Sequence, residues 1–193
     1  MKKFFHDYSY NIVKMFINQI AIAIFGTSLT IAAVSVHGDS EGFDAFTLLV
    51  SIFSILFYLF LIYNISWEIG AKDKISVDVK KKPYRPYLGV LLSLLANIPN
   101  LILVTVYASL SFSGAVQARD IVKVISCLAN GMYWGIMIVF KLQGFWASFL
   151  IAIVPAILTS GIAYYLGHKN FKFFGFITNN KPKISSDERP NMK

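Results

Sequence analysis

The chain has 193 residues, of which 56% are hydrophobic and 15% are charged, and its mean hydropathy is +0.60. Soluble domains have about 25% charged residues, so this composition is typical of a membrane protein and argues against a soluble domain. The net charge of +8 is gathered in a few segments, a distribution that favours attraction to anionic lipid headgroups over nucleic-acid binding. We therefore expect the lipid bilayer to be the main partner.

Two apolar segments come first in the chain, at 12–36 and 46–66. A helix of about 20 apolar residues crosses the roughly 30 Å hydrocarbon layer, so each segment is predicted to be a transmembrane helix. The first is too long for the apolar region of a cleaved signal peptide. The loop between them carries Asp39, Glu41 and Asp44 but no lysine or arginine.

A basic loop is predicted at 67–87, where the charges have the opposite sign. It contains Lys72, Lys74, Lys80, Lys81, Lys82 and Arg85. Positive residues are retained on the cytoplasmic side of a cell membrane, so this loop and both chain ends are predicted to be cytoplasmic. The candidate contacts to a protein partner or to headgroups on that side are Glu68, Lys80, Lys81, Lys82 and Arg85.

The third apolar segment, 88–110, is interrupted by Asn97-Ile98-Pro99-Asn100. Proline removes a backbone donor, and the flanking carboxamides are able to bond the groups that it frees. Paired interrupted helices occur at transporter binding sites. The residues predicted to line such a polar cavity are Asn97, Pro99, Asn100, Tyr107 and Pro155.

The simpler interpretation of these prolines is that they only kink membrane helices. The sequence favours this interpretation, because a transporter of this kind also needs an internal repeat. The repeat present here, Leu95-Ala96-Asn97-Ile98-Pro99 against Leu128-Ala129-Asn130-Gly131-Met132, is short.

The path of the segment at 121–140 decides the topology, because it precedes a final apolar segment at 145–166. If both crossed, the basic tail would face outside, against the charge rule. We therefore predict an all-α membrane protein with four transmembrane helices and one re-entrant or interfacial helix. Five transmembrane helices are the alternative. Residues 1–177 form the single predicted domain, and 178–193 form a flexible basic cytoplasmic tail.

Small residues recur at helical spacing on several of these segments. Close approach at small residues drives helix association in lipid, so Gly131, Gly135, Ala152 and Ala156 are predicted to be helix-packing positions. Their partner is either another helix of this chain or a second copy of it.

Residues for catalysis or metal binding do not cluster in this sequence. Cys127 is the single cysteine, and His6, His37 and His168 stand alone without the spacing of metal ligands. No nucleotide-binding or nucleophile motif is present. We therefore predict no catalytic residue, cofactor or metal, and a protein that is not an enzyme.

Three stretches resemble an uncharacterised group of small bacterial multi-pass membrane proteins: 11–19, 67–73 and 95–100. The resemblance implies a bacterial cytoplasmic membrane and carries over no activity and no functional residue. The function predicted from the sequence is an accessory or interaction subunit of a bacterial membrane complex. The alternative is a small channel or transporter for a polar solute, acting as an oligomer.

Overall fold

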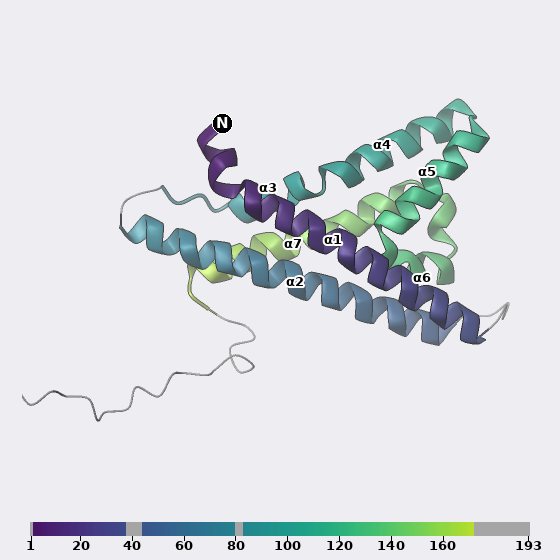
Figure 1. Ribbon diagram of the computed structural model, residues 1–193, viewed down its shortest axis with the longest axis horizontal. Helices are drawn as coiled ribbons and strands as arrows, with labels where there is room; N and C mark the ends of the chain where they lie inside the picture. The colour runs from purple at the N-terminus through teal and green to yellow at the C-terminus, as the bar shows by residue number, and fades with distance from the viewer. Residues whose placement is uncertain (1, 38–43, 80–82, 172–193) are drawn as a thin grey trace, which may run out of the picture.

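The computed structural model describes residues 2–37, 44–79 and 83–171 (Figure 1). Every regular element in these ranges is helical, which confirms the predicted all-α class. The elements are α1 (Lys2–His37), α2 (Ala45–Asp78), α3 (Leu88–Ala96), α4 (Ile98–Ser113), α5 (Val116–Ala129), α6 (Gly131–Val139), the short 3-10 helix η1 (Leu142–Gly144) and α7 (Ala147–His168).

Three of these helices are long and apolar enough to cross a membrane: α1 from His6 to Val36, α2 and α7. The other candidates are bent pairs, α3 with α4 and α5 with α6, whose axes turn by 55° and 114°. If each pair counts as one span, the number rises to five. Long apolar helices of this kind are compatible with a membrane location.

The helix α2 continues to Asp78, although a loop was expected from Trp67 onward. No proline follows until Pro83, and Lys72 bonds the carboxylate of Glu68 one turn earlier at 2.6 Å, an arrangement that supports a helix. At about 1.5 Å per residue, the 34 residues of α2 extend well past a hydrocarbon layer of about 30 Å.

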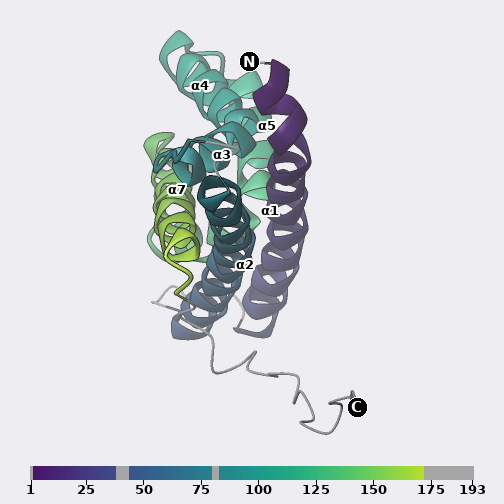
Figure 2. The ribbon, with the colours of Figure 1, turned by 90° about the vertical axis from the view of Figure 1, so that its left-hand side faces the viewer.

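The long helices share one end of the molecule, which we name the basic end because Lys72, Lys74 and Arg85 lie there. Asp73 near the end of α2 accepts hydrogen bonds from Tyr8 of α1 and Tyr164 of α7, so the start of α1 meets the ends of α2 and α7. Figure 2 views the molecule from this end. The helices α2 and α7 run toward the basic end, whereas α1 and the α3–α4 pair run away from it.

Small residues allow α2 and α7 to pack closely side by side. A side chain at Gly70 would overlap the Tyr164 carbonyl, and one at Gly167 would overlap the Trp67 carbonyl. The Ser66 and Ser160 hydroxyls are 2.8 Å apart across the same interface. The predicted packing positions Ala152 and Ala156 on α7 are both buried, as small-residue association in lipid requires.

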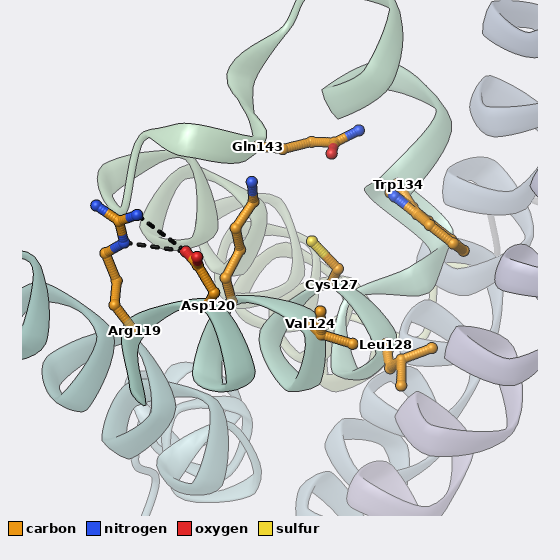
Figure 3. Close-up of a pocket in the computed structure, with 8 residues that line it drawn as sticks. Arg119, Asp120, Val124, Cys127, Leu128, Trp134 and Gln143 are labelled. Atoms are coloured by element: carbon orange, nitrogen blue, oxygen red, sulfur yellow. Dashed lines mark hydrogen bonds and ion pairs between the residues drawn. The ribbon is translucent and has the colours of Figure 1, made fainter. Parts of the chain in front are cut away.

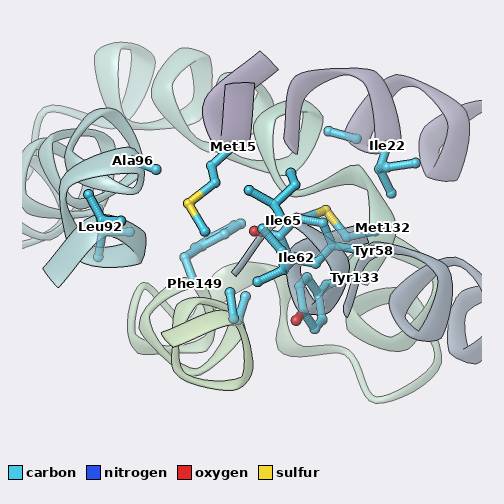
Figure 4. Close-up of a cluster of buried hydrophobic side chains, with 14 of the residues drawn as sticks. Met15, Ile22, Tyr58, Ile62, Ile65, Leu92, Ala96, Met132, Tyr133 and Phe149 are labelled. Atoms are coloured by element: carbon cyan, nitrogen blue, oxygen red, sulfur yellow. The ribbon is translucent and has the colours of Figure 1, made fainter. Parts of the chain in front are cut away.

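The interior and the surface of the bundle are both apolar. Buried side chains from α1, α2, α3, α6 and α7 converge on one core (Figure 4). Large aliphatic side chains also point outward, including Ile24 at 64% exposure, Leu49 at 64% and Leu158 at 59%. An apolar outer surface of this extent suits lipid rather than water.

Candidate functional site

The first helix break lies at Asn97, between α3 and α4. Pro99 in the first turn of α4 has no N–H group to bond the carbonyl four residues earlier, so the helix cannot continue straight through. Asn97 compensates locally, because its backbone N–H and its Nδ2 both donate to the Ser93 carbonyl, at 3.0 and 2.9 Å. The 55° bend therefore has a defined chemical cause.

The second break lies at Asn130, between α5 and α6, and is built without a proline. The Asn130 backbone N–H and Nδ2 donate to the Ser126 carbonyl at 3.1 and 3.0 Å. Gly131 then approaches α1 so closely that a side chain there would overlap the Thr27 hydroxyl and the Ala23 carbonyl. Only glycine leaves α6 room to begin against α1.

The two breaks share a local sequence and are in direct contact. Ser93-Leu94-Leu95-Ala96-Asn97 and Ser126-Cys127-Leu128-Ala129-Asn130 make the same pair of bonds to their serine carbonyls. Asn100 Nδ2, one turn beyond the first break, donates to Asn130 Oδ1 at 3.2 Å, and both residues are buried. The short repeat in the sequence therefore lies at both turns, which share their bonds to a serine carbonyl and are in contact but bend by 55° and 114°.

Polar groups gather around this contact, near the middle of the apolar segments. The Tyr58 hydroxyl of α2 is hydrogen-bonded to Asn97, and Tyr133 of α6 lies in the same core as Tyr58 (Figure 4). We name the set Tyr58, Asn97, Asn100, Asn130 and Tyr133 the central amide cluster.

Several buried atoms at the breaks have no protein partner within the described residues. They are Ser93 Oγ, Asn97 Oδ1, Ser126 Oγ and the Tyr133 hydroxyl. A buried polar atom without a partner costs about 1–3 kcal/mol, so native structures rarely keep several together without a use for them. Each of these atoms is able to hydrogen-bond a buried water molecule or a polar solute.

The predicted cavity residues have different surroundings. Asn97 and Asn100 belong to the cluster. Pro99 is exposed, and its effect is on the backbone, where it interrupts the helix. Tyr107 is buried two turns further along α4, and its hydroxyl donates to the Gln143 and Gly144 carbonyls at 3.4 and 3.3 Å. Pro155 is half-buried within α7.

Three residues of the cluster, Tyr58, Asn130 and Tyr133, were absent from the predicted cavity. The repeated Leu-Ala-Asn was the one sequence feature that pointed to Asn130. Tyr58 and Tyr133 come from other helices, and no local pattern relates either of them to Asn97.

A cleft of about 460 Å³ opens between α5, α6 and η1 (Figure 3). Its lining residues are Arg119, Asp120, Lys123, Val124, Cys127, Leu128, Trp134 and Gln143. Arg119 Nη2 pairs with Asp120 Oδ1 at 3.0 Å. The lining includes Leu128, two residues before Asn130, so the cleft approaches the second break.

The predicted packing glycines of α6 contact helices of this chain. Gly131 abuts α1, and Gly135 abuts Thr47 and Ser51 of α2. Ser51 also donates to the Met132 carbonyl and accepts from the Ile136 N–H, both at 3.1 Å. These contacts hold α6 against both long helices.

Two of the predicted partner contacts, Glu68 and Arg85, belong to the described residues. Lys72 donates to Glu68, and this hydrogen bond holds the pKa of the Glu68 carboxyl below its usual value. Arg85 is exposed, and Lys80, Lys81 and Lys82 lie outside the described residues. Within the described ranges no group of three His, Cys, Asp or Glu side chains is arranged to hold a metal ion.

In comparisons with protein families, with curated proteins and with solved structures, nothing matches this chain. The geometry of the two breaks and of the cleft is therefore the basis for assigning a function.

Proposed function

We propose that this chain is a multi-pass membrane protein that passes a small polar solute through the central amide cluster. The observation that carries the proposal is the contact of two helix breaks through Asn100 and Asn130, surrounded by buried polar atoms without protein partners. Discontinuous helices that present polar groups near the bilayer midplane are typical of transporter binding sites.

The proposed topology has four crossings, with α5 and α6 entering and leaving on the same side. A bend of 114° gives α6 a direction partly opposite to α5. The described chain also starts and ends at the basic end, through the contacts of Tyr8 and Tyr164 with Asp73. With the basic loop cytoplasmic by the charge rule, the α5–α6 pair belongs to the outer side.

The chemistry of the cluster favours a solute without a strong net charge. Carboxamides and hydroxyls offer both donors and acceptors but no full charge, and an ion deep in the bilayer needs compensating charge or many dipoles. A solute replaces the Asn100–Asn130 hydrogen bond with bonds of its own, so that the cluster opens without leaving these amides unpaired.

The test is solute flux into liposomes that contain the purified full chain, with the uncharged solutes glycerol and urea as probes. We expect Asn100→Leu and Asn130→Leu to reduce flux at least tenfold, because leucine fills the site and removes its donors. Asn64→Leu is the matched control, because Asn64 is exposed and bonds only its own helix, at the Phe60 carbonyl.

Two outcomes would contradict this function. One is wild-type flux no greater than that of empty liposomes for both probes. The other is unchanged flux in both cluster variants. Elution volume and folded yield in mild detergent separate a loss of transport from a loss of structure.

The role as an accessory subunit of a membrane complex stays a prediction from the sequence. Its proposed contacts at Lys80, Lys81 and Lys82 lie outside the described residues. The expectations of a bacterial cell membrane, of an oligomer and of no enzymatic activity likewise stay predictions.

A further inference from the structure

The cleft between α5, α6 and η1 carries a net positive charge. The guanidinium of Arg119 is offset by the carboxylate of Asp120, which accepts from Arg119 Nε and Nη2 at 3.1 and 3.0 Å (Figure 3). Lys123, one turn further along α5, lines the same cleft and has no carboxylate partner among the described residues. The ammonium of Lys123 is therefore available to an anionic ligand.

The remaining lining is mostly apolar. Val124 and Leu128 come from α5, Trp134 comes from α6, and the Gln143 amide lies across the opening from α5 (Figure 3). The volume of about 460 Å³ falls within the range of about 300–1,000 Å³ that small-molecule sites occupy. The Lys123 ammonium and the Gln143 amide are able to bind an anionic group, and the apolar wall around Trp134 is able to contact an apolar body. This combination suits an amphipathic organic anion.

We propose that this cleft binds a small organic anion with an apolar or aromatic body. Lys123 and Gln143 contact its carboxylate, and Trp134 and Leu128 contact its body. The position of the cleft on the outer side of the membrane, as an entrance to the central amide cluster, rests on the proposed function. The chemical class of the ligand rests on the cleft alone.

Cys127 provides a native reporter, because it is the single cysteine of the chain and, although only 6% exposed, lines this cleft, through which a reagent reaches it (Figure 3). In the full chain in mild detergent, the rate of Cys127 modification is measured with two methanethiosulfonates of similar size. One carries a sulfonate and the other a trimethylammonium group. We expect the anionic reagent to react faster, and phenylacetate to slow both reactions more than phenethylammonium does.

Substitutions at Lys123 test the origin of this preference. Lys123→Gln is expected to lower the anionic-to-cationic rate ratio roughly fivefold to tenfold. A unit charge about 7 Å from the charged group of the reagent, in a water-like dielectric, changes the energy of each reagent by about 0.6 kcal/mol, with opposite signs for the two reagents. Lys123→Arg keeps the ratio within about twofold, because the charge is retained. Lys141→Gln is the matched control, because Lys141 is exposed and does not line the cleft.

Equal rates for the two reagents, or a ratio and phenylacetate protection unchanged in Lys123→Gln, would overturn the proposed anion site. The failure of the proposed function has a different signature. Phenylacetate would then protect Cys127 as expected while glycerol and urea show no flux in liposomes, and the anion site would stand without transport. Flux without any charge preference at Cys127 would overturn the anion site alone.

Discussion

Asn130 uses both ends of its carboxamide. Its nitrogen donates to the Ser126 carbonyl of its own helix, and its oxygen accepts from Asn100 of α4. Leucine has the same branched side-chain skeleton but makes neither bond, so the two asparagines link the helix breaks in a way that an apolar pair does not. In lipid, such interhelical hydrogen bonds contribute on average about 0.6 kcal/mol and at most about 1.7 kcal/mol.

A double-mutant cycle on Asn100 and Asn130 measures this link. We expect each single change to leucine to cost about 1–3 kcal/mol, because one partner is left buried and unpaired. The double variant should cost less than the sum, by about 0.5–1.5 kcal/mol. Unfolding of the purified protein by titration with denaturing detergent gives these values. Strict additivity, or a comparable loss in the exposed control Asn64→Leu, would argue against the link.

The element that controls the second break is α6, through its glycine contacts. Gly131 and Gly135 bring the backbone of α6 against α1 and α2, and the Ser51 hydroxyl bridges the Met132 carbonyl and the Ile136 N–H. The preceding helix α5 has a different environment. Its apolar residues Ile121 and Ile125, which do not line the cleft, are 63% and 45% exposed, a pattern typical of an amphipathic helix with one apolar outer face.

Gly131→Ala is expected to destabilise the protein by about 1–3 kcal/mol, because the added methyl meets backbone and hydroxyl groups that have little room to move. Gly144→Ala is the matched control, since a side chain at Gly144 would meet open space. The difference in melting temperature between the two variants in mild detergent checks this. Equal melting temperatures would mean that α6 does not depend on its contact with α1.

At the scale of the whole molecule, the chain is a bundle in which the two bent pairs are asymmetric. The 55° pair continues from the basic end toward the opposite end, whereas the 114° pair turns back on itself (Figure 1). The Asp73 carboxylate holds the basic end together by accepting from Tyr8 at 3.0 Å and from Tyr164 at 3.2 Å. This arrangement predicts which ends of the helices are accessible to a reagent outside the cell and which are accessible only from the cytoplasm.

Single cysteines in a Cys127→Ser background test that pattern. With four crossings, a membrane-impermeant maleimide labels Gly144→Cys in intact cells, and labels Lys169→Cys only after permeabilisation. With five crossings the two positions exchange their behaviour, because the chain then crosses once more between Gly114 and Lys141. Both residues are exposed, so failure to label reflects sidedness rather than burial.

The sequence by itself determined the helical class, the approximate positions of the apolar segments, the interruption at Asn97 to Asn100, and the small residues for close packing. These are local properties, set by hydropathy over about 20 residues and by the backbone chemistry of proline, glycine and asparagine. The repeated Leu-Ala-Asn lies at both helix breaks, but an interruption was predicted only at the first.

Only the tertiary structure decided how these elements meet. Residues from different helices form the contact between Asn100 and Asn130 and the cleft that Gln143 lines. Tyr58 and Tyr133 likewise reach the central amide cluster from two different helices. Their proximity depends on the sharp turn at Asn130 and on the fit of Gly131 against Ala23 and Thr27. A hydropathy pattern contains no information on such long-range contacts, because every helix in lipid has an apolar surface whichever neighbour it packs against.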